Sequence, residues 1–509
     1  RYGAHADERA GRLAMHFSEA ATLSPRFSDK AAKYSGVAGR QALAQSAYPE
    51  AARHFRAALS AREGQEVDDE MAGLLFELGK VAAHNAEISE SWRSLRQAFD
   101  YYARVENIPR AVDVAYEAGT SMLLIRISQA QLIERALALV EEGTEEYGKL
   151  NAALGQSLGL LGQIDRAREA FARAEAVAVK LKLPRLELDV LRFSQYVIGF
   201  QLELDEAVAI GDRAIALARE LGEPLIEAIA HFFNAGQFWV GRLDQAEKHG
   251  QALRALADRL RIPYTISNAA YAQAQHAVAR GDWEAARQAL QWGLDVGSPD
   301  ARLLAYHARI AFQLGDVQLA RSYQQRLVDF VANISPGPNI EYVELATTAA
   351  RACQFNLRAS DVEIVRRAVQ AVVSSPVAGT ALLVGQAYSA LAIVACVTGD
   401  RDTAENVLPR IEALGSLATG PCPQSDHIRG LILEVLDRIE EAVEAIETGL
   451  GFLPPAYKPQ RAEAAYDCAR IRLQRDAPGD RARARELIAE ALGHAQQLGM
   501  KPLVDRIVA

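Results

Sequence analysis

The chain has 509 residues, of which 50% are hydrophobic and 24% are charged, and its formal net charge is −9. This acidic balance argues against a nucleic-acid-binding or anionic-membrane-binding surface over the whole molecule, so we expect no direct nucleic-acid partner and no membrane partner. The cysteines lack CxxC spacing, the histidines form no HExxH set, and no apolar run is expected to reach transmembrane length. We therefore predict a cytoplasmic protein with reduced thiols and no metal site.

Residues 1–30 are predicted to form a capping or junction helix. The chain begins at Arg1 and not at methionine, so we expect it to be a fragment with a neighbouring segment on its N-terminal side. A regular repeat array is predicted over 31–330. Residues 331–509 are predicted to continue the array less regularly and to end in a C-terminal cap.

The array is predicted from a short motif, roughly Gly-x-apolar-acid-x-Ala, that recurs along the chain. Clear copies are GQIDRA at 162–167 and GRLDQA at 241–246. A fixed period in this range is typical of repeat proteins. The largest irregularity is a step of 34 residues to Ala320 followed by 44 to Ile364. We call the closing residue of each copy its anchor, and the anchors are Ala51, Ser91, Ala130, Ala167, Ala207, Ala246, Ala286, Ala320, Ile364, Ala404, Ala442 and Ala484.

Small and large residues at fixed distances from the anchor predict a pair of packed helices in each repeat. A small residue such as Gly79 or Gly155 stands twelve positions before the anchor, and a large one such as Leu95 or Phe171 stands four after it. Such residues let two helices approach and interlock. Gly-Asp pairs such as 281–282 would end the first helix and cap the second. Prolines such as Pro184 would start the next repeat, so we expect almost no strand.

This pattern of small and large residues resembles the tetratricopeptide repeat. The long period is closer to the sensor region of the signal-transduction ATPases with numerous domains, similar to the maltose-regulon transcription activator family. The segments DERAGRLAMHF at 7–17 and KYSGVAGRQAL at 33–43 also resemble the region on the C-terminal side of the ATPase module in such proteins. The resemblance implies an all-α, right-handed superhelical solenoid of about twelve tetratricopeptide-like helix–turn–helix repeats of about 40 residues.

Two short motifs look catalytic but lack the context that catalysis needs. The sequence GTEEYGKL at 143–150 matches a phosphate-binding loop except at its last position, where Leu150 replaces serine or threonine. The sequence GQSLG at 155–159 matches a nucleophile elbow, which requires a preceding strand. We interpret the first as a loop between repeats and the second as part of a helix, and we predict no catalytic residues.

In tetratricopeptide arrays the first helix of each pair lines the concave face, and the resemblance places its inward positions about 18, 15, 11 and 8 residues before the anchor. Between 189 and 312 these positions are rich in aromatic, amide and charged side chains, which suit a peptide or a small polar ligand. Any concave surface that faces solvent would also be polar. The candidate groove residues are Asp189, Arg192, Tyr196, His231, Phe238, Asn268, Tyr271, Gln275, Arg302, Arg309 and Phe312.

The resemblance implies a non-enzymatic sensor region of a larger signalling ATPase or transcription regulator. Its partner would be a protein, a peptide or a small-molecule inducer, and it would contact a nucleotide-binding module absent from this chain. ATP and magnesium are expected only on that N-terminal module. The alternative is a stand-alone tetratricopeptide scaffold or peptide receptor, which agrees with the polar, arginine-rich last repeat at 481–485.

Overall fold

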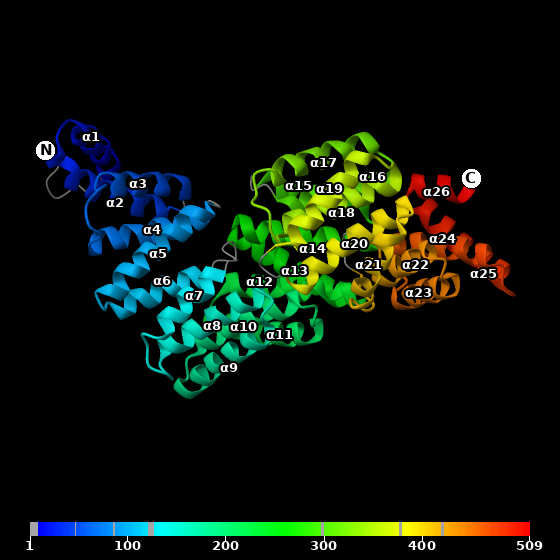
Figure 1. The fold of residues 1–509 in the computed structure, drawn as a ribbon, viewed down its shortest axis with the longest axis horizontal. Helices are drawn as coiled ribbons and strands as arrows, with labels where there is room; N and C mark the ends of the chain where they lie inside the picture. Colours follow the sequence, from blue (N-terminus) through cyan, green and yellow to red (C-terminus); the bar gives the residue numbers. More distant parts are fainter. Residues whose placement is uncertain are drawn as a thin grey trace. The chain divides into compact units, whose positions relative to one another are not determined.

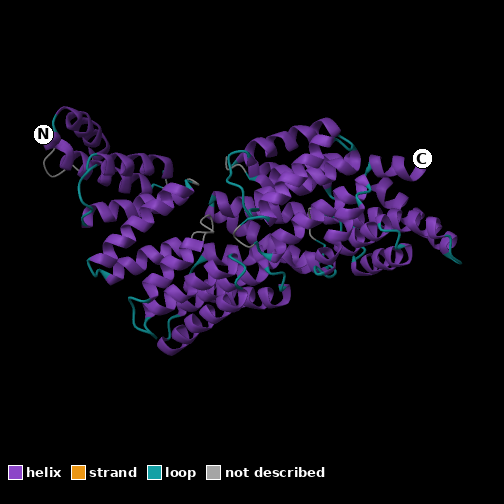
Figure 2. Cartoon of the chain, viewed as in Figure 1, coloured by secondary structure: helices purple, strands orange, loops and turns teal. Residues whose placement is uncertain are grey.

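The computed structural model describes residues 9–45, 47–84, 87–120, 127–296, 300–375, 379–418 and 422–509. Helices, turns and loops account for all of these residues, and no strand occurs among them (Figure 2). The prediction of an all-α fold is therefore confirmed.

The chain divides into two compact units, Arg1–Phe193 and Ser194–Ala509, and the boundary falls inside a helix. The boundaries predicted at residues 30 and 330 stay predictions. Figure 1 labels the helices. The first unit contains α1 (Ala10–Leu23), the 3₁₀-helix η3 (Pro25–Phe27), α2 (Ser28–Ala44), α3 (Tyr48–Ser60), α4 (Asp69–His84), α5 (Ile88–Arg104), α6 (Ile108–Thr120), α7 (Ile127–Leu137), α8 (Glu145–Leu160), α9 (Ile164–Leu181) and the start of α10 (Pro184–Phe200).

The second unit begins within α10. It contains α11 (Leu204–Leu221), α12 (Pro224–Asn234), the 3₁₀-helix η4 (Ala235–Val240), α13 (Leu243–Leu260), α14 (Pro263–Arg280), α15 (Trp283–Asp295), α16 (Ala301–Leu314), α17 (Val317–Val331), α18 (Ile340–Phe355), α19 (Ala359–Val373), α20 (Ala381–Thr398), α21 (Arg401–Glu412), α22 (Ser425–Val435), α23 (Ile439–Phe452), α24 (Lys458–Arg475), α25 (Asp480–Gln497) and α26 (Lys501–Val508).

Helices α2 to α25 follow one another as twelve helix–turn–helix pairs in the described part of the chain, and every predicted anchor lies on the second helix of its pair. The predicted small and large residues meet. A Cβ atom added to Gly155 would lie 2.6 Å from the ring of Phe171, and one added to Gly79 would lie 2.6 Å from Leu95. The chain is therefore an all-α array of tetratricopeptide-like repeats, held together by the predicted close approach of paired helices.

The substitution Gly155→Ala is expected to lower the free energy of unfolding by about 1–3 kcal/mol, because the new methyl group would overlap Phe171. Gly493 is a matched control, since it is an exposed residue of α25 and a Cβ added there meets no atom within 4 Å. Gly493→Ala is expected to stabilise the helix by about 0.5–1 kcal/mol. Urea unfolding of the full chain measures both changes, and equal effects would contradict the packing.

The turns inside and between repeats form as the local sequence predicts. Gly281 ends α14 with a φ of 81°, and the Asp282 carboxylate accepts a hydrogen bond from the amide of Ala285 at 3.0 Å. Pro184 is the first residue of α10. Two residues before it, Lys182 adopts a left-handed conformation at the end of α9. Glycine and proline thus set the two kinds of turn by their own backbone preferences.

In one repeat a polar side chain takes the place of the predicted apolar anchor, and in another a polar side chain is buried beside the anchor Ala130, which is itself buried. In α19 the buried residue is Asp361, which accepts hydrogen bonds from Arg321 and Gln324, whereas the predicted Ile364 is only half-buried. In α7 the amide of Gln129 is buried and donates to the carbonyl of Ala118. A polar side chain can occupy this position because its hydrogen bonds are satisfied there.

The two catalytic-looking motifs have the structures predicted for them. Gly143 adopts a φ of 80° in the loop before α8, and Thr144 caps that helix by accepting from the amide of Tyr147 at 3.2 Å. No strand precedes this loop in the described residues of the first unit. Residues 155–159 lie inside α8 and are buried, so Ser157 is not presented at a turn.

Helix α20 corrects one expectation from the sequence. Its 18 residues have a mean hydropathy of 1.8, so by length and composition alone it could cross a membrane. It is the single helix of this kind in the described ranges. The helix packs against α18 and α22, and 61% of its residues are buried. Its apolar composition thus matches a central position in the stack, where a helix is covered on several sides.

Helices of the C-terminal repeats of the second unit pack against helices of its middle repeats. Helix α24 packs against α14, and α26 packs against α16. The indole of Trp283 donates to the carbonyl of Leu498 at 2.8 Å, and the hydroxyl of Tyr457 donates to the carbonyl of Phe238. The chain's own side chains therefore fill much of the space between the middle and C-terminal repeats.

Candidate functional site

The eleven residues predicted to line a groove fall into both units. Asp189 and Arg192 belong to the first unit, and the other nine belong to the second. In the first unit, Arg192 Nε lies 2.7 Å from an oxygen of Asp189, and the hydroxyl of Tyr116 donates to the other oxygen at 2.7 Å. Burial and the Asp189 charge raise the pKa of Tyr116, so it stays a neutral donor. The polar side chains of Tyr116, Asp189 and Arg192 thus hydrogen-bond to one another.

At the start of the second unit, Tyr196 and His231 occupy separate clusters. Tyr196 is half-buried and packs its ring against Phe200 and Phe233, with centroids 4.6 and 5.1 Å away. His231 is buried, and its Nδ1 lies 2.9 Å from Nδ1 of His249. Nε2 of His231 lies 3.3 Å from a terminal nitrogen of Arg219 and 3.8 Å from Oε1 of Glu227.

The His231–His249 pair predicts a loss of stability in weak acid. Burial, the charge of His249 and the charge of Arg219 lower the pKa of His231 to about 4. The unfolded chain therefore binds more protons between about pH 6.5 and pH 4, and stability falls as the pH falls through this window. His231→Gln is expected to remove about 2 kcal/mol of the loss between pH 7 and pH 5. Urea unfolding of both proteins at the two pH values tests this, and parallel losses would contradict it.

The next predicted residues form a polar layer along α14 and α16. Arg302 pairs with Asp300 at 2.7 Å, donates to the side chain of Asn268 at 3.0 Å, and lies over the ring of Tyr271 at 4.7 Å. The hydroxyl of Tyr271 in turn lies 3.3 Å from Oε1 of Glu344. Arg302 of α16 thus has an ion-pair partner in Asp300 and contacts with Asn268 and Tyr271 of α14. These contacts join α14 to α16.

Phe312 belongs to the core and not to a surface. It is fully buried, and its ring stacks on Phe355 at a centroid distance of 5.7 Å. Ala311, Ala320 and Ala352 complete the cluster around it. Phe312 therefore cannot touch a ligand in this structure.

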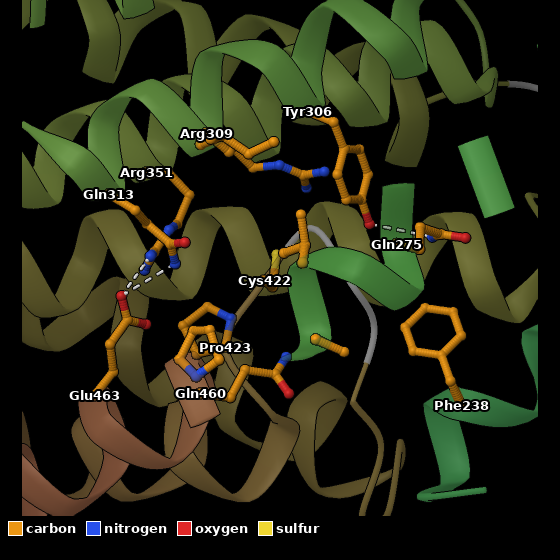
Figure 3. Close-up of a pocket in the computed structure, with 14 residues that line it drawn as sticks. Phe238, Gln275, Tyr306, Arg309, Gln313, Arg351, Cys422, Pro423, Gln460 and Glu463 are labelled. Atoms are coloured by element: carbon orange, nitrogen blue, oxygen red, sulfur yellow. Dashed lines mark hydrogen bonds and ion pairs between the residues drawn. The ribbon is translucent and has the colours of Figure 1, made fainter. Parts of the chain in front are cut away.

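Three predicted residues, Phe238, Gln275 and Arg309, line one cavity of about 40 Å³ inside the second unit (Figure 3). One side of the cavity is formed by η4, α14, α16 and α18, and the other by α24 and the residues just before α22. The complete lining is Phe238, Gln275, Val278, Ala279, Tyr306, Arg309, Ile310, Gln313, Arg351, Cys422, Pro423, Pro459, Gln460 and Glu463. We call it the Arg309 pocket.

Arg309 is the unusual member of this pocket. Its side chain is only 6% exposed, and neither of its terminal nitrogens, Nη1 and Nη2, has a hydrogen-bond partner. The guanidinium lies over the ring of Tyr306 at 3.6 Å, and Tyr306 is fixed by a hydrogen bond from Gln275 at 3.1 Å. A buried cation with unused donors is costly, so a group that accepts from it would bind well.

The second arginine of the pocket is already paired. Arg351 Nη2 lies 2.7 Å from an oxygen of Glu463, and the two side chains are 7% and 10% exposed. The amide of Gln313 reaches the same oxygen at 3.5 Å. The pair joins α18 to α24 across the cavity, as the dashed lines in Figure 3 show.

Sequence reasoning missed Tyr306, Glu344, Arg351 and Glu463. Arg351 and Glu463 each stand between buried alanines, at 349–352 and 462–465. A charged residue inside such a run is a signal for a buried polar contact, since the run itself must face the core. Their pairing across 112 residues had no local signal.

The pocket can bind and orient a ligand, and no arrangement for covalent chemistry was found in it. Burial raises the pKa of the Cys422 thiol to about 12, which keeps it a poor nucleophile near neutral pH. No group of three or more histidine, cysteine or acidic side chains suited to a metal ion occurs among the residues the structure describes. The groups that the pocket offers for recognising a ligand are the guanidinium of Arg309, the tyrosine Tyr306 and the side-chain amides of its glutamines.

No family model matches the chain. No curated protein matches it either. Among solved structures, the chain is similar to the APC/C hetero-tetramer Cut9–Hcn1, with 14% identity, a TM-score of 0.40 and coverage of 94% of this chain and 96% of that one.

Two further solved structures are similar at the same level. A Rap protein complexed with competence and sporulation factor has 14% identity and a TM-score of 0.41, and the match covers 70% of this chain and 98% of that one. A signal transduction ATPase with numerous domains that has a tetratricopeptide repeat sensor, from Pyrococcus horikoshii, has 13% identity and a TM-score of 0.41, covering 66% and 52%. At such identities the likeness concerns the fold alone.

Proposed function

We propose that this chain is a non-enzymatic sensing domain of a larger signalling ATPase or transcription regulator, and that the Arg309 pocket is where it binds its ligand. The observation that carries the proposal is a buried arginine whose two terminal nitrogens are unpaired at a cavity. Polar groups left unsatisfied inside a protein lower stability, and they are expected mainly where function requires them.

The position of the pocket supplies a mechanism. Its walls come from the middle repeats and from the C-terminal repeats of the second unit, which are also joined by polar contacts such as Arg351–Glu463. A ligand that touches both walls binds the closed arrangement better than an open one, and so shifts the balance toward it. In the larger protein this shift would alter contacts with an N-terminal nucleotide-binding module, where ATP and magnesium would bind.

Replacing Arg309 is expected to raise the stability of the ligand-free protein and to weaken its binding of the ligand. Arg309→Met removes the unpaired cation and keeps an apolar stem, so the ligand-free protein should be stabilised by about 1–2 kcal/mol. Arg326 is the matched control, because it also lies over a tyrosine, Tyr323, yet is exposed and does not line the pocket. Arg326→Met should change stability by less than about 0.5 kcal/mol. Urea unfolding monitored by tryptophan fluorescence makes the comparison.

The proposal is tested by a thermal-shift screen of the full chain against small acids, neutral sugars, nucleotides and short peptides. A compound that binds the pocket should raise the midpoint of wild-type unfolding and of Arg326→Met, but not that of Arg309→Met. A compound that stabilises all three proteins equally would place the sensing site elsewhere. If only large protein partners bind, and Arg309→Met binds them as well as the wild type, the chain is a scaffold.

A further inference from the structure

We infer that the Arg309 pocket takes a small acid with a single negative charge, its carboxylate paired with both terminal nitrogens of Arg309. This inference rests on the proposed function and adds the chemical class of the ligand. It follows from the charges, the donor geometry and the size of the pocket.

The charges of the pocket leave room for one negative charge. Arg309, Arg351 and Glu463 are the charged residues that line it, and Glu463 already neutralises Arg351 at 2.7 Å. One cation therefore lacks a partner. A phosphate, which carries close to two negative charges at neutral pH, would have to lie near the Glu463 carboxylate as well, and that repulsion disfavours it.

Glu344 does not take the place of the missing anion. Its Oε1 accepts from the hydroxyl of Tyr271, and its Oε2 has no partner, so it makes no hydrogen bond to Arg309. Burial raises the pKa of Glu344 to about 7, and the charge of Arg309 is the main effect that opposes this rise. The Glu344 carboxyl is therefore partly protonated near neutral pH, and the Arg309 charge is not fully balanced.

The donors of Arg309 match a carboxylate. The guanidinium of Arg309 is planar and lies over the ring of Tyr306 at 3.6 Å, and its two terminal nitrogens, both unpaired, offer adjacent donors in that plane. Two parallel N–H groups meet the two oxygens of a carboxylate in one plane. Across the cavity, one end of the Gln460 side-chain amide is also without a partner. That atom is the amide oxygen Oε1, which accepts, so a hydroxyl group beside the carboxylate would satisfy it by donating to it.

The walls and the volume limit the rest of the ligand. Phe238, Val278, Ile310 and two prolines supply an apolar lining. A cavity of about 40 Å³ gives room for roughly three water-sized positions at 10–15 Å³ each. The ligand is thus a short acid, about the size of propionate or lactate, and not a peptide that runs through a groove.

Isothermal titration of the full chain with propionate, lactate, their neutral amides and inorganic phosphate tests the inference. The acids should bind the wild type, while the amides and phosphate bind at least about tenfold more weakly. Arg309→Met should weaken acid binding by about 10- to 100-fold, and Arg326→Met should leave it unchanged. Glu463→Gln keeps an oxygen for Arg351 but frees one positive charge, so it should shift the preference toward phosphate.

Three other results of these experiments would each contradict a different part of the proposal: the acid class, the small size of the ligand or the proposed function. If the amides bind the wild type as well as the acids do, and Arg309→Met loses both, the acid class is wrong but the sensing site stands. If a tetrapeptide with a free C-terminus binds as tightly as propionate and its amidated form does not, the carboxylate is recognised but the small-acid assignment is wrong. If no compound in the broad thermal-shift screen depends on Arg309, the proposed function fails as well.

Discussion

Glu463→Ala is expected to destabilise the second unit by about 3–5 kcal/mol, because it leaves the buried Arg351 cation without a counter-ion. Arg351 would keep a hydrogen bond to Oε1 of Gln354, at 2.5 Å, and a contact with the ring of Phe355, at 5.6 Å, but no counter-ion. The pair also links the C-terminal repeats to the middle ones, so its loss should loosen the packing of α24 first. Unfolding in urea, followed by tryptophan fluorescence, reports mainly on this unit, since three of the four tryptophans, Trp239, Trp283 and Trp292, belong to it, and Trp92 belongs to the first.

The control for this substitution is a solvent-exposed ion pair that also consists of an arginine and a glutamate. Glu363 pairs with Arg367 at 2.5 Å on α19, with 52% and 79% of the two side chains exposed. Glu363→Ala should therefore cost less than about 1 kcal/mol. The double variant Arg351→Met with Glu463→Met should recover most of the stability, because neither charge is then left buried alone. If Glu463→Ala and Glu363→Ala behave alike, the pair does not hold the unit closed.

The repeats could be predicted because their signals are local. Glycine at 281 and proline at 184 act through their own backbone preferences, and the small residue Gly155 meets Phe171 within one helix pair. Such contacts depend on residues fewer than about twenty positions apart, so a period in the sequence records them. Ile364 is the one predicted anchor that the structure does not bury, and Asp361 is buried in the same helix. Asp361 is buried because Arg321 and Gln324 satisfy it, and no pattern of apolar residues reveals that.

The pocket could be predicted only in part. The structure places Gln275 of α14 and Arg309 of α16, two of the residues that the rule for inward positions selected, in the lining of the Arg309 pocket. The rule assumed that the faces of α14 and α16 that carry them look onto solvent, whereas the packing of α24 on α14 and of α26 on α16 covers much of these faces. That packing joins segments more than 100 residues apart, as Arg351–Glu463 does at a separation of 112. Contacts of that range depend on the path of the whole array, which the repeat period does not specify.

Substitutions of Phe312 can distinguish a residue that faces a solvent-filled groove from one that is buried in the core. The inward-position rule makes Phe312 a groove residue, but the structure buries it fully against Phe355. Phe312→Ala is therefore expected to cost about 3–5 kcal/mol of unfolding free energy, and Phe312→Leu less than about 1.5 kcal/mol. Once either variant is folded, its affinity for a ligand of the Arg309 pocket should equal that of the wild type.

The two measurements together distinguish a core residue from a binding residue. A groove residue would lose affinity on truncation and keep most of its stability, since no cavity would form in the core. If Phe312→Ala unfolds at the wild-type urea concentration but binds ligand more weakly, α16 must turn that face toward solvent in solution. The packing of α16 against α18, which buries Phe312 on Phe355, would then be wrong, and α16 and α18 both supply residues to the Arg309 pocket.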